Sequence, residues 1–348
     1  MKKKLKPKAK RVIIIFSAIF LVFIAIGTYV IIDEYSYRFT EAVIKNGSFK
    51  VYPGQTFEQV AQDLEAKGLI ASAKKMKRTA IAQEKDTAIV GFYAFKKGDS
   101  YRTLLNHLSS GHQSPVRITF NNIRTLDQLA ARVARSTLAT KEDLMAQFQE
   151  EAKESGDPEN YIARFMPNTY EVYWTITPKE FTSMMKKEYD DFWDSKGRLS
   201  KAEALGLSPE QVMTLASIVI EETKAEKEMT TVAGVYINRL RKKMPLQADP
   251  TVKFAIGDFS IRRITGRHLR IESPYNTYRQ AGLPPGPICV PPIAVVDAVL
   301  DYVDNEHHWI YFCANADFSG THSFASSLLE HQRNASSYHR ALNGRRIH

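Results

Sequence analysis

The feature that most constrains this chain is an apolar run near its N-terminus, from Val12 to Ile32. It reads VIIIFSAIFLVFIAIGTYVII and holds no charged side chain over 21 residues. A helix needs about 20 apolar residues to cross the hydrocarbon layer of a membrane, whereas the apolar part of a cleaved signal peptide has about 7–15. The run leads directly into Asp33 and Glu34, without a cleavage site of small residues. We therefore predict a membrane-anchoring helix at residues 12–32 rather than a cleaved signal or a buried core helix.

Positive charge is concentrated just before this run. Lysines and Arg11 supply seven charges within residues 1–11, out of a formal net charge of +10, which leaves +3 for residues 12–348. Basic residues on one side of a membrane span place that side in the cytoplasm. The sequence thus predicts a cytoplasmic tail at residues 1–11 and a single-pass protein of the cell (inner) membrane, with residues 33–348 outside the cytoplasm. Because the rest of the chain has an ordinary mixed surface charge, nucleic acid is not an expected partner.

The composition is that of a folded protein large enough for two or three domains. Hydrophobic residues make up 44% and charged residues 25% of 348, which excludes a disordered chain. Cys289 and Cys313 are the only cysteines, too few for a disulfide-stapled mini-domain. They could pair in an oxidising compartment or be buried separately, and the sequence does not decide between these. Neither a metal-ligand motif nor a phosphate-binding loop is present, so we predict no metal and no cofactor.

Three stretches between residues 46 and 135 share one local pattern: an extended segment, a turn and a capped helix. In the first, Pro53-Gly54 forms the turn and Thr56 pairs with Gln59 in a capping box. The second and third helices begin after Ser100 and Thr125. Small modules of this kind resemble LysM domains, which bind polymers containing N-acetylglucosamine. A generic α+β spacer explains the pattern equally well.

A strong helix start at Ser208 opens the segment that we predict to carry the active site. Ser208 and Gln211 form a capping box around a proline at the first helical position. At 100° per residue, Glu222 lies at the border of the apolar face and Glu221 points to solvent. A carboxyl beside an apolar wall has a raised pKa, which suits a general acid. A border glutamate that simply pairs with an arginine is the alternative. The apolar face consists of Val212, Leu215, Ala216 and Val219.

The loops after this helix are rich in amide, hydroxyl and aromatic side chains, and proline and glycine interrupt them. Such side chains suit a sugar, which offers hydroxyl groups at its edge and C–H groups on its face. Each is also a common turn or capping residue, and for Asp249, which precedes Pro250, this reading is nearly as good. The predicted glycan-binding residues are Asn238, Gln247, Asp249, Thr251, Tyr275 and Asn276.

Taken together, these segments resemble the YceG-like family of endolytic murein transglycosylases over most of residues 45–345. The resemblance rests on the motifs at residues 216–219, 222–223, 235–240, 246–252, 275–278 and 282–288, with further matches at 167–170, 322–324 and 330–331. One position departs from the family, because Ile220 stands where many members have a first glutamate. The second family glutamate aligns with Glu222. Glu228 aligns with a further acidic position, either structural or part of the site.

The resemblance implies a membrane-anchored lytic transglycosylase that cleaves the bond between N-acetylmuramic acid and N-acetylglucosamine in nascent peptidoglycan. Such enzymes use one carboxyl, here Glu222, and leave 1,6-anhydro ends, which would terminate strand elongation. Glycan strands are the implied partner, and cell-wall synthesis proteins are left open as further partners. The implied fold class is α+β: a transmembrane helix, a LysM-like region at residues 46–135 and a catalytic domain at 136–345. A peptidoglycan hydrolase and a non-catalytic wall-binding scaffold are the rival hypotheses.

Overall fold

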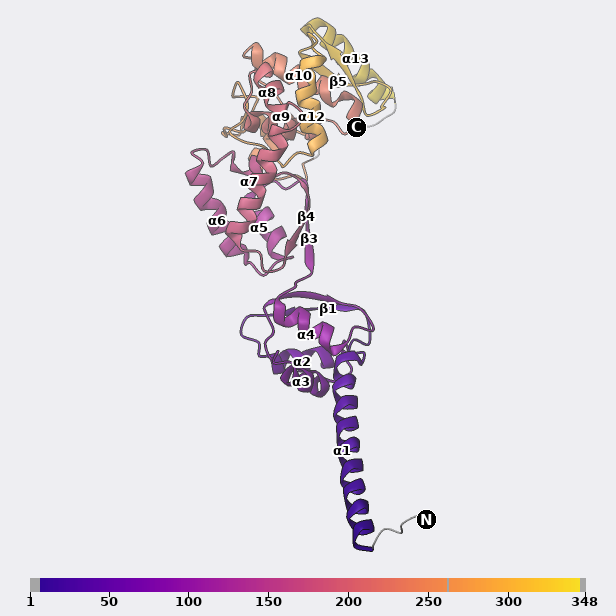
Figure 1. Ribbon diagram of the computed structural model, residues 1–348. Coiled ribbons are helices and arrows are strands. Elements are labelled where there is room, and N and C mark those ends of the chain that lie inside the picture. Colours follow the sequence, from indigo (N-terminus) through magenta and orange to yellow (C-terminus); the bar gives the residue numbers. More distant parts are fainter. Residues whose placement is uncertain (1–6, 262, 345–348) are drawn as a thin grey trace. The chain divides into compact units, whose positions relative to one another are not determined.

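The computed structural model describes residues 7–261 and 263–344 and has a mixed α+β fold with an N-terminal apolar helix, as predicted (Figure 1). Its contacts divide the chain into two compact units. The first comprises residues 1–116 with 172–175, and the second 117–171 with 176–348. This division falls near residue 116, whereas the sequence pattern put the end of the LysM-like region at residue 135. The third capped helix, α5 (Leu126–Ala134), therefore belongs to the second unit.

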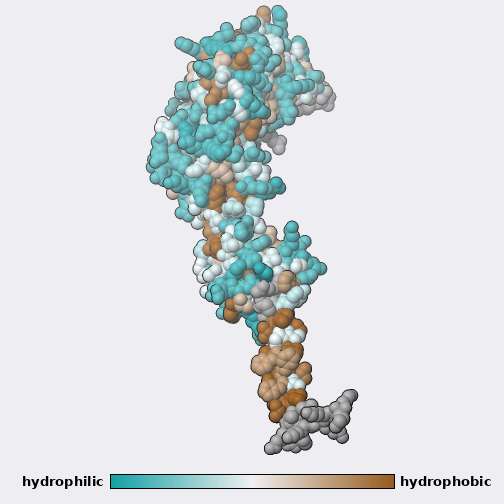
Figure 2. All heavy atoms as spheres, in the orientation of Figure 1, coloured by the Kyte–Doolittle hydropathy of each residue, from teal (hydrophilic) through white to brown (hydrophobic). Residues whose placement is uncertain are grey.

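The predicted membrane helix lies within a single long helix, α1 (Pro7–Phe39). Its segment Val12–Asp33 has a mean hydropathy of 2.7, and none of it is buried. Figure 2 shows this segment as an apolar surface. Among the described residues, it is the one helix long and apolar enough to cross a membrane. Residues 1–6 of the predicted basic tail lie outside the described residues.

In the first unit, an antiparallel strand pair packs on three short helices. Phe49 lies opposite Tyr93 in this pair, and both side chains are buried. The predicted helix starts at Thr56 and Ser100 are confirmed, since each side chain accepts a hydrogen bond from the backbone three residues on. The elements are β1 (Gly47–Val51), α2 (Phe57–Ala66), α3 (Ala73–Ala82), β2 (Gly91–Phe95) and α4 (Tyr101–Ser110).

The second unit is built around helix α9 (Pro209–Glu222), which begins at the predicted Ser208–Gln211 capping box. The other helices and strands of this unit, besides α5, are β3 (Pro115–Phe120), α6 (Lys141–Glu154), η1 (Tyr161–Arg164), β4 (Asn168–Tyr173), α7 (Pro178–Asp194), α8 (Arg198–Leu205), α10 (Glu226–Arg241), α11 (Asp249–Ile256), η2 (His268–Arg270), α12 (Ile293–Leu300), η3 (Asp301–Asp304), β5 (Tyr311–Ala314), β6 (His322–Ala325) and α13 (Leu328–Gly344). The division between the two units falls within β3 and β4.

The middle of helix α9 is buried on all sides rather than on one face. Every residue from Val212 to Val219 is buried, because α8, α10, α11 and α12 all pack against this helix. The prediction of a single apolar stripe was therefore too narrow. The consequence for the site is that the two glutamates, Glu221 and Glu222, stand at the carboxyl end of a helix whose middle is buried.

The C-terminal part of the second unit is a small hairpin covered by a helix. Strands β5 and β6 are antiparallel, and α13 contacts both. Cys313 lies in β5 and Cys289 precedes α12, and both cysteines are free in this structure. Burial raises the pKa of the Cys289 thiol to about 12, so this cysteine is an unreactive core residue.

Candidate active site

Glu222 is the last residue of α9, and local backbone geometry fixes it there. The next residue, Thr223, is extended (φ −136°, ψ 141°), so the helix ends before it. The Thr223 N–H still donates to the carbonyl of Val219 at 3.0 Å, which closes the last helical turn. The buried body of α9 therefore holds the Glu222 side chain at a fixed place, and its carboxyl faces a pocket.

Glu222 has an environment that favours its neutral form. Burial raises the pKa of its carboxyl to about 7, and the negative charge of Asp249 adds to this effect. The hydroxyl of Tyr236, on α10, donates to Oε1 of Glu222 at 3.0 Å, and this hydrogen bond acts to lower the pKa, as do the charges of Lys253 and Arg239. Near pH 7 the carboxyl is consequently poised between its protonated and ionised forms.

The pocket around this carboxyl has a volume of about 280 Å³ and collects side chains from distant parts of the second unit. Its lining comes from α9, α10, α11, β5, α13 and two connecting loops. The lining residues are Glu222, Tyr236, Arg239, Leu246, Gln247, Asp249, Tyr278, Phe312 and His331. Within the described residues there is no group of three or more acidic, histidine or cysteine side chains that could hold a metal ion.

A second carboxyl in the pocket, Asp249, is also bound to a tyrosine. The hydroxyl of Tyr278 donates to Oδ1 of Asp249 at 2.6 Å. Burial raises the pKa of Tyr278, and its hydrogen bond to Asp249 raises it further, so the phenol stays a donor. Asp249 stands at the first position of α11, where the helix N-terminus stabilises a negative charge. The pocket thus holds two carboxyls, each in contact with its own tyrosine.

Two of the predicted glycan-binding residues line this pocket: Asp249 and Gln247. Gln247 has a left-handed backbone (φ 54°), which is uncommon for a residue with a side chain. Its N–H donates to the carbonyl of Thr277 at 3.0 Å, which holds the loop in this conformation. The side chain of Gln247 is exposed at the pocket. Strained residues of this kind are frequent at binding sites.

Three other predicted residues, Asn238, Thr251 and Asn276, are buried and do not line this pocket. The Asn238 amide donates to the carbonyls of His307 and Trp309 at 2.7 and 3.0 Å. Asn276 likewise donates to two backbone carbonyls, at 2.9 and 2.8 Å. Thr251 donates to the carbonyl of Ala248 at 2.8 Å. These side chains satisfy backbone groups that would otherwise be unpaired in the core, so their role is to hold the loops in place.

The two remaining predicted residues also lie elsewhere. Tyr275 lines a separate hollow of about 210 Å³, where its ring packs against Phe254 with centroids 4.7 Å apart. Glu228 is buried and accepts hydrogen bonds from the backbone N–H of His322 at 2.9 Å and from its Nδ1 at 3.1 Å. The His322 ring in turn meets Phe312 in the pocket wall, with centroids 5.2 Å apart. Glu228 thus supports the wall of the pocket from behind.

Glu221 does not point to solvent, contrary to the sequence prediction. Its carboxyl lies 3.3 Å from the guanidinium of Arg124, and the two side chains are only 21% and 17% exposed. Arg124 also covers the ring of Phe259. The segment that precedes α5, which contains Arg124, covers the side of α9 on which Glu221 lies. A helical wheel shows only the residues of one helix, so it could not reveal this contact. Glu221 is therefore an ion-paired structural residue.

Arg239, Tyr236, Tyr278, Phe312 and His331 line the pocket although they were not predicted as site residues. All except Phe312 lie within segments that carry the family resemblance, but no spacing rule marks them. Arg239 is buried, and it donates through Nε to the carbonyl of Ile310 at 2.7 Å and through Nη1 to that of Leu246 at 2.6 Å. It therefore joins the loop before α11 to the residue preceding β5.

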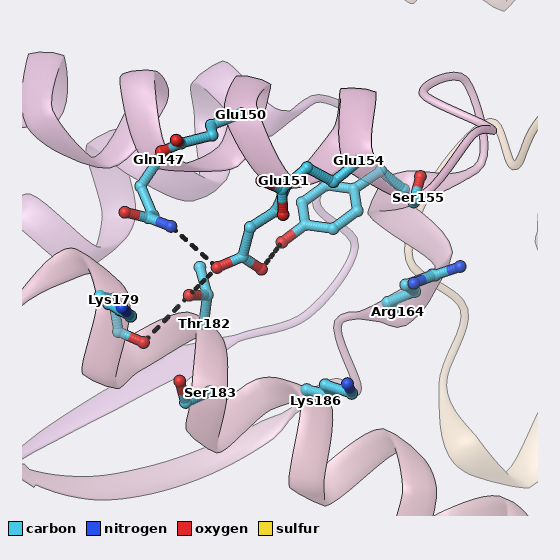
Figure 3. A pocket seen from close by; sticks show the side chains of 11 residues that line it. Gln147, Glu150, Glu151, Glu154, Ser155, Arg164, Lys179, Thr182, Ser183 and Lys186 are labelled. Carbon is cyan, nitrogen blue, oxygen red and sulfur yellow. Dashed lines mark hydrogen bonds between the residues drawn. The ribbon is translucent and has the colours of Figure 1, made fainter.

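A larger polar groove of about 440 Å³ lies between α6 and α7 (Figure 3). At its centre, Glu151 accepts hydrogen bonds from Tyr161 at 2.7 Å, from Gln147 at 2.9 Å and from Thr182. These three donors satisfy both oxygens of the carboxylate. The central carboxylate of the groove is thus fully engaged within the protein, and the smaller pocket at Glu222 is the better candidate for an active site.

Comparisons with known proteins agree with the resemblance seen in the sequence. The model of the YceG-like family matches residues 49–337, so the chain belongs to this family. A protein from Bacillus subtilis (strain 168) named endolytic murein transglycosylase is 29% identical over 308 residues, which cover 82% of each chain. A protein of the same name from Streptococcus pneumoniae (serotype 2, strain D39) is 25% identical over 322 residues, covering 82% of this chain and 57% of that one.

The fold also has a relative among solved structures. The crystal structure of a yceG-like protein from Listeria monocytogenes matches with a TM-score of 0.53 and 24% sequence identity. The match covers 83% of this chain and 99% of the other. This likeness extends the family relationship to the three-dimensional fold.

Proposed function

We propose that this protein is an endolytic murein transglycosylase and that Glu222 is its catalytic acid and base. Membership of the YceG-like family and the names of the Bacillus and Streptococcus relatives support the reaction class. The observation that carries the assignment to Glu222 is its pKa of about 7 in a pocket where one tyrosine is its only hydrogen-bond donor among the described residues. A carboxyl with a pKa near the working pH can both give and recover a proton.

The proposed reaction uses one carboxyl twice, first as an acid and then as a base. Glu222 donates its proton to the oxygen that links N-acetylmuramic acid to N-acetylglucosamine, and the bond from that oxygen to the muramic C1 breaks. Positive charge at C1 is stabilised by the substrate's own N-acetyl group. The ionised Glu222 then takes the proton of the muramic C6 hydroxyl, whose oxygen bonds to C1 and closes the 1,6-anhydro ring. No water is consumed, and the internal nucleophile is already close to the carbon it attacks.

The walls of the pocket suggest how the glycan is held. Gln247 and Asp249 offer an amide and a carboxylate to sugar hydroxyls, and Phe312 offers an aromatic wall to the apolar face of a sugar ring. Tyr275, in a separate hollow, is proposed to contact a sugar further along the strand. Asn238, Thr251 and Asn276 would act indirectly, through the loops that they hold.

A hydrolase acting on the same polymer is the second candidate, because Asp249 places another carboxyl in the pocket. Ordinary glycosidases use two carboxyls, one of which activates water or attacks the sugar. Mass spectrometry of purified glycan strands digested by the full-length protein in detergent separates the two reactions. The proposal predicts 1,6-anhydro ends that disappear with Glu222→Gln. Reducing ends formed by addition of water would establish the hydrolase instead.

The apolar helix supports a further part of the proposal, the anchoring of the catalytic unit to the membrane. Basic residues before Val12 and acidic residues after Ile32 favour a cytoplasmic N-terminus, with residues 33–348 outside the cytoplasm. In this position the enzyme would meet nascent strands and end their elongation. A periplasmic reporter fused after His348 should be active, whereas activity of a cytoplasmic reporter at that position would overturn the topology.

The first unit is proposed to position the glycan, as a LysM-like module would. Its strand pair and capped helices support this idea, since they follow the pattern that suggested the module. Deletion of residues 46–112 should weaken binding to murein sacculi and leave some cleavage of soluble strands. Unchanged binding to sacculi would argue for a plain spacer.

A further inference from the structure

His331, in the first turn of α13, lines the pocket but takes no part in the proposed proton transfers. Its ring stacks on that of Tyr311, with centroids 5.2 Å apart and an interplanar angle of 20°. The backbone N–H of His331 donates to the carbonyl of Ser327 at 3.0 Å. Glu330 stabilises the start of α13, because its side chain accepts a hydrogen bond from the backbone N–H of Ser326 at 3.0 Å. The imidazole is therefore held at the pocket by both stacking and the helix start.

The ring is neutral near pH 7. Burial lowers the pKa of His331, and the positive charge of Arg239 lowers it further. A position in the first turn of a helix also disfavours a positive charge, because the free N–H groups there carry partial positive charge. A neutral imidazole carries one N–H and one bare nitrogen, and the surroundings of the two nitrogens determine which is which.

The two ring nitrogens of His331 have different surroundings. Nδ1 is fully buried and has no hydrogen-bond partner among the described residues. A buried N–H without an acceptor is rarer and costlier in proteins than an unpaired acceptor. The proton therefore belongs on Nε2, which is not enclosed in this way and lies on a side chain that lines the pocket.

The other donors of the pocket are largely used by the protein itself. The Tyr236 and Tyr278 hydroxyls donate to carboxyls, and Arg239 donates through Nε and Nη1 to backbone carbonyls. A glycan offers ring, glycosidic and acetamido oxygens that accept hydrogen bonds. We propose that His331 presents its Nε2–H to the pocket and donates to an oxygen of the bound glycan, as a substrate-binding residue of this enzyme. This inference rests on the proposed function, since it requires glycan in the pocket.

The test compares three substitutions in the full-length protein, with KM and kcat measured on purified glycan strands. His331→Leu removes the donor and should lower kcat/KM by about tenfold or more, mainly through KM. His331→Gln puts an amide N–H near the position of Nε2 and should recover most of this loss. His331→Asn puts its amide near the position of Nδ1 and should not. His308→Gln changes an exposed histidine outside the pocket and should leave both constants unchanged.

The outcomes separate this inference from the proposed function. Wild-type KM in all three His331 variants, together with an inactive Glu222→Gln, would overturn the role of His331 and leave the proposed function standing. An active Glu222→Gln would overturn the proposed function itself. If His331→Leu fails to fold, the Gln and Asn variants still decide the matter. Nitrogen-15 NMR of the wild-type ring gives an independent reading: a proton on Nε2 is expected, and a proton on Nδ1 would contradict the inference.

Discussion

Glu151 and Glu222 each line a polar hollow of the second unit, and each accepts a hydrogen bond from a tyrosine hydroxyl, yet their surroundings differ. Glu151 accepts from two further neutral donors, Gln147 and Thr182, which together satisfy a carboxylate. Glu222 has a single donor among the described residues, lies close to another carboxyl, and has a pKa raised to about 7 by burial. The comparison teaches that a tyrosine partner does not by itself set the state of a glutamate: in the proposed function, burial and the small number of donors distinguish Glu222 from Glu151.

The largest expected effect is a contrast between two matched variants, one of which loses activity and the other stability. Glu222→Gln keeps the size of the side chain but cannot cycle a proton, so kcat should fall by about 10³-fold while the protein stays folded. Glu151→Gln leaves the proposed chemistry intact but replaces one acceptor oxygen with an amide N–H that faces other donors, so it should cost about 1–2 kcal/mol of unfolding free energy and little activity. Rates on glycan strands and thermal unfolding measure both. Equal losses of activity in the two variants would contradict the proposal that Glu222 serves the reaction and Glu151 the fold.

Removing the neighbouring charge should shift the pH profile of the enzyme. In the proposed reaction the protonated form of Glu222 is the active one, so kcat/KM of the wild type should fall as the pH rises through about 7. Asp249 raises the pKa of Glu222, so Asp249→Asn should move this alkaline limb to lower pH. A pH series for both proteins checks the sign. An alkaline limb that stays in place would mean that Asp249 does not act on Glu222.

Removing the hydroxyl of Tyr236 should shift the pH profile of the enzyme in the opposite direction. The hydrogen bond from Tyr236 lowers the pKa of Glu222, so Tyr236→Phe should move the alkaline limb to higher pH. The matched control is Tyr161→Phe at Glu151, which should lower stability by about 1 kcal/mol without moving the profile. A shift in the control variant would show that the two tyrosine–glutamate pairs are not independent.

The smallest effect is expected at Glu221. Its ion pair with Arg124 is partly exposed, so Glu221→Gln should cost about 1 kcal/mol or less of unfolding free energy. The rate should stay within about twofold of wild type, because the carboxyl of Glu221 is engaged outside the Glu222 pocket. Chemical denaturation and steady-state rates provide the check. A loss of activity as large as that of Glu222→Gln would mean that the wrong glutamate has been chosen.

Local features of the fold could be predicted from the sequence because neighbouring residues determine them. Thr56, Ser100 and Ser208 each cap a helix through a hydrogen bond that spans only three residues. The wheel placed Glu222 beside an apolar wall, and the structure does bring it to a pocket at the end of a buried helix. The partner of Glu221 could not be predicted, because Arg124 lies 97 residues away in the chain.

The lining of the pocket was harder to predict, for two physical reasons. Amide and hydroxyl side chains suit a sugar but equally satisfy buried backbone groups, and Asn238 and Asn276 do the latter. Tyr278 and His331 reach the pocket from segments remote from α9, so no local period marks them. Sequence patterns thus indicate which segments build a site more readily than which side chains face it.

The most direct test of the account is a titration of the Glu222 carboxyl itself. Carbon-13 NMR of glutamate-labelled, full-length protein in detergent, compared with the Glu222→Gln variant, isolates the resonance of this one group. The account predicts a midpoint near pH 7, in agreement with the alkaline limb of kcat/KM. A midpoint near the ordinary value of 4.5 would contradict it, because the carboxyl would then be ionised at neutral pH and could not donate the first proton.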